Sequence, residues 1–473
     1  MKKTLAVLAS FMLLICMISA ANAQGGSEGT TSTSILVQNL STSTAQVRVD
    51  FYNTGGTNTG YKEATSLGGE RTVTFDQRSS SGDPGTTPFQ GAAIVSASQP
   101  IGAVVQEVRS GGSGGVNSYE AYNGLATAAQ SVRAPLILRG ISSAGKTWNT
   151  FMSIQNTSLS AVAHVTVVFS PSGLGTGTTA SYNIPAGGSQ YVMQKDQTAL
   201  GAQFFGSAKI TSDQDVAVVV NSGTTDGSAL IAYPTFTAGS TTVYLPGAMK
   251  NIVSEGNNYF TSLTIVNLGN PGDPAPIVSV LYQPKTGTAT AAYNVTVSTA
   301  TTIDQRVDSH ITSSTFFGAV KLVSTNGTAI AAMLNTRGDT PGGVSKYATT
   351  YGGFATGVTT AYVPYLLKSI NSAGYNWSTS ILLQNLDPAS GNLQATITYN
   401  EDPSIGSHTY NSPKTIATFD SVDLRYDANL TQATFYGGAK IVSTNSRPFG
   451  VVVLVRGSVG AGDSLSSYLG ASQ

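Results

Sequence analysis

The chain repeats one unit four times, and this repetition limits the possible folds more than any other feature of the sequence. A short motif recurs as TSILVQN, FMSIQN, TSLTIVN and TSILLQN, ending at Asn39, Asn156, Asn267 and Asn385. These Asn residues are 117, 111 and 118 residues apart. A Phe-x-Gly sequence begins 48 to 50 residues after each Asn, and a Tyr follows it by 77 to 84 residues. A constant period of this length indicates tandem copies of one domain.

Each copy has the sequence pattern of β-structure. In the first copy Val47, Val49 and Phe51 alternate with polar residues, as expected for a half-buried strand. Gly-, Pro- and Asn-rich turns separate such stretches, and no long stretch shows helical periodicity. About seven short strands per copy predict an immunoglobulin-like β-sandwich. We therefore predict an all-β chain of four tandem sandwiches in an extended array, covering residues 24–130, 131–241, 242–359 and 360–473.

Residues 1–23 have the features of a secretory signal peptide. Lys2 and Lys3 precede an apolar run, and Ala21-Asn22-Ala23 offers a small-residue cleavage site. Cys16 is the alternative as a lipid-attachment site, but Ile15 precedes it where a lipoprotein signal requires a small residue. Without residues 1–23 the chain has no cysteine, and no other apolar run is long enough for a membrane span. We expect export to the cell surface or the extracellular space, with the periplasm left open.

The charge of the chain excludes one class of partner. Only 10% of the residues are charged, compared with about 25% in ordinary soluble domains. Removal of two signal-peptide lysines leaves 22 basic and 24 acidic side chains, and they form no basic run. The electrostatic pattern of a nucleic-acid-binding protein is therefore missing.

A segment of constant length precedes the Asn motif in the second, third and fourth copies. Each has a Pro 21 residues before the Asn, a cation four residues after the Pro, and an aromatic residue eight before the Asn. These are Pro135, Arg139 and Trp148; Pro246, Lys250 and Tyr259; and Pro364, Lys368 and Trp377. Flexible linkers seldom keep a constant length, so we predict rigid inter-domain joints. The first copy has no such segment, and Thr31 takes the place of the aromatic residue.

The WNTxxxxQN block after a PLIL strand resembles repeats of uncharacterised exported bacterial proteins. The resemblance covers nearly the whole chain after residue 23. It implies export and tandem β-domains and brings no activity with it. The third copy departs from the pattern with Tyr259-Phe260, and the fourth has Trp377-Ser378.

The sequence offers little for catalysis. His164, His310 and His408 share no position in the repeat and no metal-binding spacing, so we interpret them as surface residues. We therefore predict that the chain is not an enzyme.

An Asp and a Lys recur at similar places in most of the repeats. Asp76, Asp304 and Asp420, replaced by Gln194 in the second copy, suggest turn caps; the alternative, calcium, requires more clustered oxygens. Lys209, Lys321 and Lys440 suggest an isopeptide bond to Asn, but their neighbours face inward and direct the lysines outward. We expect no cofactor, with calcium as the weaker alternative.

We predict a structural protein: a surface-layer, filament or adhesin component that associates with itself or with other cell-envelope proteins. The alternative is a polysaccharide-binding protein that uses Trp148 and Trp377 to stack on sugar rings. Their constant distance from Pro favours a packing role instead.

The missing segment in the first copy predicts an unpaired sheet edge. Such an edge can accept a strand from another chain, and residues 24–33 or the tail after Tyr468 are the expected donors. The alternative is that the N-terminal stretch folds back and covers this edge.

We expect the secreted chain to begin at Gln24 and to carry no lipid. The intact mass of the exported protein measures both properties. A mass that includes a diacylglyceryl group on Cys16 would contradict the assignment.

Overall fold

The computed structural model describes residues 12–18, 30–77, 89–112, 115–270, 272–402, 405–458 and 462–472. The proposed cleavage site, Ala21–Ala23, lies outside the described residues. The chain is all-β, with several separate sheets. Among the described residues, no helix is long and apolar enough to cross a membrane.

The strands follow the four repeats of the sequence. Repeat 1 contains β1 (Met12–Ile18), β2 (Thr30–Asn39), β3 (Ala45–Asn53), β4 (Asn58–Leu67), β5 (Thr72–Asp76), β6 (Gly91–Ala97), β7 (Ile101–Ser110) and β8 (Asn117–Asn123). Repeat 2 contains β9 (Ala129–Arg139), β10 (Ile141–Ser143), β11 (Lys146–Asn156), β12 (Ala163–Leu174), β13 (Thr178–Ile184), β14 (Ser189–Met193), β15 (Phe204–Thr224) and β16 (Leu230–Pro234), with short 3₁₀ turns at Gln194–Asp196 and Thr198–Leu200.

The second half of the chain repeats this order. Repeat 3 contains β17 (Thr242–Lys250), β18 (Ile252–Ser254), β19 (Asn257–Asn267), β20 (Ile277–Pro284), β21 (Tyr293–Thr296), β22 (Ala300–Asp304), β23 (Phe316–Ser324), β24 (Ile330–Asp339) and β25 (Ser345–Gly352). Repeat 4 contains β26 (Thr360–Lys368), β27 (Ile370–Ser372), β28 (Tyr375–Asn385), β29 (Leu393–Glu401), β30 (Thr409–Ile416), β31 (Phe419–Asp423), β32 (Phe435–Ser443), β33 (Phe449–Ser458), β34 (Gly462–Asp463) and β35 (Leu465–Leu469), with a 3₁₀ turn at Pro388–Ser390.

Each repeat has two sheets around a buried core. In repeat 3 the outer sheet has the order β17-β23-β20-β21, and the inner sheet has β18-β19-β24-β25 with β22 beside β19. Repeat 4 matches it, and in repeat 2 the long strand β15 joins the two sheets into one. This order differs from the predicted immunoglobulin arrangement, in which the first two strands are neighbours in one sheet. Here β17 and β19 lie in different sheets, a feature that alternation of apolar residues does not encode.

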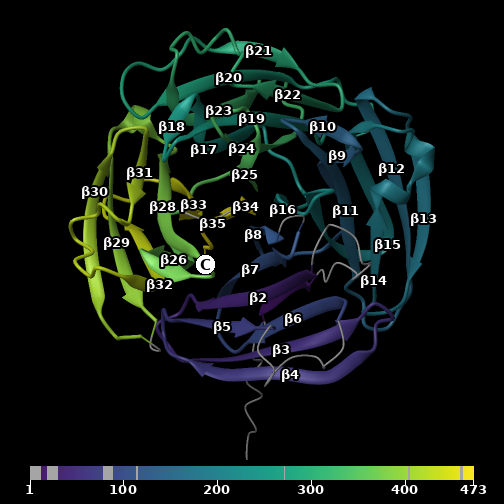
Figure 1. The fold of residues 1–473 in the computed structure, drawn as a ribbon, viewed down its shortest axis with the longest axis horizontal. Coiled ribbons are helices and arrows are strands. Elements are labelled where there is room, and N and C mark those ends of the chain that lie inside the picture. Colours follow the sequence, from purple (N-terminus) through teal and green to yellow (C-terminus); the bar gives the residue numbers. More distant parts are fainter. Residues whose placement is uncertain are drawn as a thin grey trace, which may run out of the picture.

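The four repeats form a closed ring, so the expected extended array is wrong (Figure 1). Repeat 4 contacts repeat 1 directly: Lys440 Nζ lies 2.5 Å from Glu70 Oε1, and Thr74 Oγ1 lies 2.7 Å from the Tyr436 hydroxyl. Apolar residues of repeat 1, including Leu36 and Val104, belong to the core cluster of repeat 4. The repeat period of the sequence could not predict this closure, because it gives the length of each domain but not the angle between neighbouring domains.

The last strands of the repeats, β8, β16, β25 and β35, contact one another at the centre of the ring (Figure 1). Glu120 of β8 is fully buried there, and its Oε1 accepts hydrogen bonds from Thr349 Oγ1 at 3.0 Å and from Ser467 N at 3.2 Å. β34 adds a parallel pairing across the ring, from Gly462–Asp463 to β8. The buried Asp463 accepts bonds from the backbone N–H groups of Ala348, Leu465 and Leu230.

The first repeat differs from the others in the origin of one strand. β1, which lies within the predicted signal peptide, pairs antiparallel with β6. It occupies the position that β9, β17 and β26 occupy beside β15, β23 and β32. The edge predicted to be unpaired therefore holds residues 12–18. The described parts of the predicted donors are engaged elsewhere, because Thr30–Asn39 pairs within its own sheet and Ala471 bridges to Tyr362; residues 24–29 lie outside the described residues.

The buried carboxyl group of Glu120 makes stability depend on pH. Burial raises its pKa well above the usual range, although backbone N–H groups of Ala121 and Ser467 oppose the shift. A carboxyl whose folded pKa is raised stabilises the fold below its unfolded pKa, and this stability is lost as the pH rises through the folded value.

We expect Glu120→Gln to be more stable than the wild type at pH 8, by about 1.4 kcal/mol for each unit of raised pKa. The difference should shrink at pH 4. Urea unfolding midpoints at the two pH values measure it, with the exposed Asp196→Asn as the matched control. A variant less stable than the wild type at pH 8 would contradict the assignment.

Candidate functional site

Two equivalent grooves lie between neighbouring repeats. The groove between repeats 4 and 1 has a volume of about 330 Å³, and the groove between repeats 2 and 3 has about 270 Å³. Trp377 lines the first and Trp148 the second, and matching residues of β26 and β9 accompany them. The only two tryptophans of the chain therefore occupy the same place in two grooves.

The joint aromatics contact the next repeat around the ring. Trp377 is only 5% exposed, and its ring packs edge-on against Tyr119 of repeat 1, with centroids 4.7 Å apart. Trp148 belongs to a cluster that includes Met333 and Ala348 of repeat 3. In the third copy, Arg456 of repeat 4 lies over the Tyr259 ring, 5.8 Å from its centroid. Side chains this buried pack an interface and present no open face to a sugar.

The groove between repeats 2 and 3 has a charged rim. Arg306 and Arg337 lie over Phe260, 3.9 and 4.7 Å from its ring centroid. Burial alone would raise the pKa of Asp304, but hydrogen bonds from Arg306 outweigh it and lower that pKa. Arg337 also donates to Ser143 Oγ of repeat 2 at 2.9 Å and so bridges the two repeats.

The groove between repeats 4 and 1 is lined mainly by uncharged polar groups, with one carboxylate, that of Asp76, which accepts a hydrogen bond from Ser34 Oγ at 3.2 Å. Gln106 Nε2 donates to the Tyr365 hydroxyl at 3.3 Å across the interface. Burial raises the pKa of Tyr436, which is bonded to Thr74. Aromatic rings beside amide and hydroxyl groups are a lining suited to a neutral polar ligand.

The Pro residues and cations of the predicted joints act within their own repeats, so this part of the prediction is corrected. Pro135, Pro246 and Pro364 lie in β9, β17 and β26, where the pairing register shifts. The cations bind loop carbonyls of their own repeats. Arg139 donates to Gln194 O and Lys195 O, Lys250 to Ile311 O and Lys368 to Leu430 O. Of the Pro, the cation and the aromatic residue, the aromatic residue contacts the neighbouring repeat, and so do other residues of the segments, such as Ser143 and Glu255.

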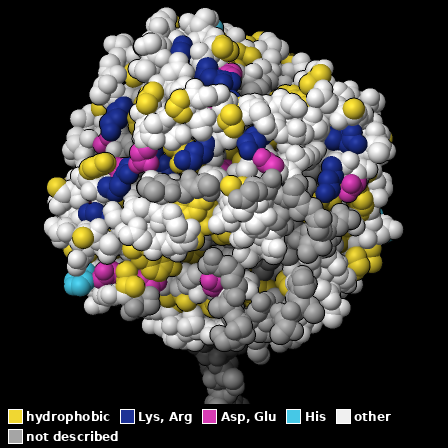
Figure 2. Space-filling model, in the orientation of Figure 1, with side chains coloured by type: hydrophobic (Ala, Val, Ile, Leu, Met, Phe, Trp, Pro, Cys, Tyr) yellow, Lys and Arg dark blue, Asp and Glu magenta, His cyan; other side chains and the backbone are white. Residues whose placement is uncertain are grey.

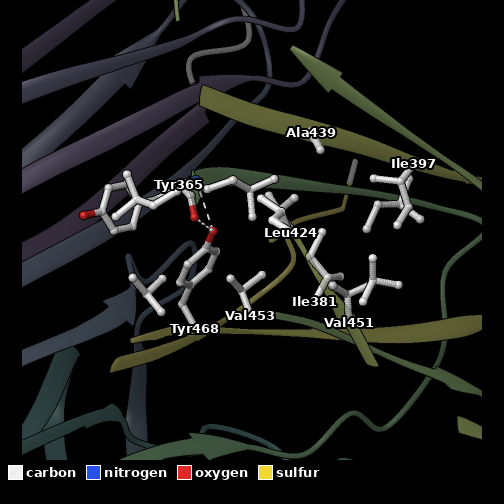
Figure 3. Close-up of a cluster of buried hydrophobic side chains, with 14 of the residues drawn as sticks. Tyr365, Ile381, Ile397, Leu424, Ala439, Val451, Val453 and Tyr468 are labelled. Carbon is white, nitrogen blue, oxygen red and sulfur yellow. Dashed lines mark hydrogen bonds between the residues drawn. The ribbon is translucent and has the colours of Figure 1, made fainter. Parts of the chain in front are cut away.

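The recurring Tyr has a role that its spacing alone did not reveal. The hydroxyl of Tyr233 donates to Leu136 O at 2.6 Å, and Tyr351 and Tyr468 bond Pro246 O and Tyr365 O in the same way. Figure 3 shows Tyr468 reaching Tyr365 beside the buried core of repeat 4. Each of these tyrosines thus bonds the first strand of its own repeat at the place where the pairing register of that strand shifts.

The recurring Asn residues tie loops together. In Asn385 the amide Nδ2 donates to Gly391 O and Ala417 O, while Oδ1 accepts from Asp387 N. Asn39, Asn156 and Asn267 use the same atoms in the corresponding turns.

In the first and fourth copies, the Gln before the Asn reaches the preceding repeat. Gln38 donates to Ala439 O of repeat 4, and Gln384 donates to Val320 O of repeat 3. The QN pair thus links the loops of one repeat and also links that repeat to its neighbour.

The recurring Asp positions require a correction. Strand register places Asp76, Asp304 and Asp423 opposite equivalent serines, whereas Asp420 lies three residues earlier. Met193, not Gln194, holds that position in repeat 2. Asp304 accepts the Arg306 N–H at 2.9 Å, the bond expected of a turn cap. Asp420 instead lies 2.8 Å from Lys285 of repeat 3.

Each histidine lies beside a carboxylate on its own repeat. His164 Nδ1 lies 2.6 Å from Asp213, His310 Nδ1 lies 2.8 Å from Asp308 and His408 Nδ1 lies 2.6 Å from Glu401. His310 also stacks on Tyr293 and lines a loop cavity of about 750 Å³ in repeat 3. Among the described residues, no three His, Cys, Asp or Glu side chains form a group that could hold a metal ion.

The recurring lysines lie at different contacts. Lys440 pairs with Glu70 of repeat 1, and Lys321 lies 5.6 Å from the centroid of the Tyr244 ring. Lys209 lies in β15, at a paired position between β12 and β9.

No family model matches the chain, and no curated protein matches it. Solved structures show distant likenesses. The crystal structure of Thermotoga maritima 1070 is 14% identical and has a TM-score of 0.20, covering 24% of this chain and 94% of that one. Allantoicase from Saccharomyces cerevisiae is 6% identical with a TM-score of 0.12, covering 48% and 75%. The RrgB pilus protein of Streptococcus pneumoniae is 9% identical with a TM-score of 0.10, covering 97% and 89%. At these TM-scores none of them carries an argument about this chain.

Trp377 should stabilise the contact between repeats 4 and 1. We expect Trp377→Ala to lower the free energy of unfolding by about 3–5 kcal/mol, because a buried indole is lost. The matched control Tyr426→Ala, at a site 79% exposed, should cost about 0.5 kcal/mol or less. Urea unfolding measures both. Loss of sugar binding with unchanged stability would instead assign Trp377 to a ligand.

Proposed function

We propose that this protein is an exported, non-enzymatic structural component of the bacterial cell surface or extracellular matrix. It would serve there as a surface-layer, filament or adhesin subunit. The observation that carries the proposal is the closure of four repeats into one body through the contact between repeats 4 and 1. A ring with a shared core holds its surface in a fixed geometry, which suits a scaffold.

The surface of the ring supports a role in assembly. Strand β30 at the edge of its sheet carries Pro413 and Lys414, and the exposed positions of the edge strand β13 hold the polar residues Thr179, Ser181 and Asn183. Such features prevent uncontrolled pairing of edges. On the face shown in Figure 2, charged side chains lie scattered among uncharged polar groups and backbone. Contacts with partners would then depend on particular sites rather than on a general charge.

The N-terminal sequence and the resemblance to repeats of exported bacterial proteins support the proposed location. The same features leave the periplasm open as the site of action.

A polysaccharide-binding role is the second candidate, and the two equivalent grooves favour it. Gln106 and Asn335 line the grooves at matching positions, beside aromatic rings. Planar amides and aromatic rings are suited to sugar hydroxyls and ring faces.

The structural role predicts that antibodies label intact cells and the surrounding matrix, and that electron microscopy shows the protein in ordered assemblies. A cytoplasmic protein in fractionated cells would contradict the proposal. Glycan arrays decide the second candidate. Binding that is lost in Gln106→Ala and Asn335→Ala, but kept in the exposed control Gln46→Ala, would favour polysaccharide recognition.

A further inference from the structure

Repeat 1 contains an acceptor position for a β-strand. In repeats 2, 3 and 4 the first strand fills this position and contributes inward side chains to the core. These side chains are 3% exposed or less: Val132, Ala134, Val243, Leu245, Ala361 and Val363. The position therefore selects apolar residues at alternate places along a strand.

In repeat 1 this position is filled by β1. Its register runs from Met12 opposite Ala97 to Ile18 opposite Gly91. Counted from this glycine, Leu14 and Cys16 hold the register positions that Ala361 and Val363 hold in repeat 4. The apolar stretch Met12–Ile18 thus meets the requirement of the acceptor.

Removal of residues 1–23 would uncover the β6 edge. The edge would then present backbone N–H and C=O groups, together with the Ala93 and Val95 side of the core. An uncovered edge of this kind is a template for adding a strand.

Neither the sequence of residues 24–29 nor the described part of the chain after it offers a replacement strand. Residues 24–29 are Gln-Gly-Gly-Ser-Glu-Gly and contain no apolar side chain. Ala471 is bonded to Tyr362, and every described strand of seven or more residues after Ala23 is paired within a sheet. A second copy has the same sequence, so its described strands are already paired in the same way.

We propose that the exported protein binds, on the β6 edge, a strand from a different protein. This strand is an extended segment of about seven residues, apolar at alternate positions, that runs antiparallel to β6. The proposal rests on the proposed export of the chain and on cleavage after Ala23, and it names the kind of partner that a surface scaffold of this structure would hold.

A cross-linking experiment tests the register. The exported chain, residues 24–473, has no cysteine, so Ser96→Cys introduces a single thiol. The probe is a peptide of residues 10–20 with Cys16→Ala, which keeps this position apolar, and with two added lysines for solubility. With Leu13→Cys, which lies opposite Ser96, the peptide should form a disulfide with the protein. With Leu14→Cys, one position out of register, it should not.

A binding experiment tests the side-chain pattern. The peptide without an introduced cysteine should bind one to one and raise the melting temperature of the wild-type chain. Leu14→Asp, at the register position that the buried Ala361 holds in repeat 4, should weaken binding at least tenfold. Leu13→Asp should change it little, because the equivalent Thr360 and Thr242 are partly exposed.

Three results would overturn the proposal. They are no binding of the peptide, equal cross-linking of the Leu13→Cys and Leu14→Cys peptides, or an exported chain that retains residues 12–18. If residues 24–473 unfold without the peptide, recovery of β-sheet circular dichroism on its addition supports the proposal, and no recovery overturns it. Antibody labelling of cells tests the proposed location separately. A surface protein that ignores the peptide would refute this inference alone, and a cytoplasmic protein would refute the proposed function.

Discussion

The contact between the last repeat and the first is the constraint on which the rest of the structure depends. It includes an ion pair, several hydrogen bonds and a core shared between the two repeats. Separation of these repeats would expose apolar surface to water, at a free-energy cost of roughly 25 cal/mol for each Å² exposed. It would also open the centre, where β8 carries Glu120 against residues of repeats 3 and 4. The buried carboxyl is tolerated because the closed ring supplies its donors.

Three positions of the recurring segment make different contacts that hold the ring together. Its Asn holds the loops of its own repeat, and its Gln reaches back to the preceding repeat where Gln38 and Gln384 occur. The aromatic residue eight positions earlier packs toward the following repeat, as Trp377 does against Tyr119. One strand thus touches three repeats, which explains why this segment varies less from copy to copy than its surroundings.

The sequence predicted an all-β chain of several β-units, because alternating apolar residues and a constant repeat period are visible in a single sequence. It failed where the answer depended on pairs of residues distant in the chain. Lys440 and Glu70 are ordinary charged residues until the ring brings them together. Asp420 was aligned with the wrong position because loop lengths differ, and only the register showed that Asp423 matches Asp304. The burial of Glu120 could not be predicted, because a single Glu in a strand is usually exposed and its sequence does not mark it as buried.

The central strands have a consequence for how such a protein can evolve. Arrays in which each repeat touches only its neighbours can gain or lose a copy and remain folded. Here the last strands of the four repeats contact one another, and Glu120 of repeat 1 accepts hydrogen bonds from Thr349 of repeat 3 and Ser467 of repeat 4. A recombination that removed one copy would leave a gap at the centre of the ring, and one that duplicated a copy would cause a steric clash there. The gene is therefore expected to keep its copy number and to diversify through its outer loops and grooves.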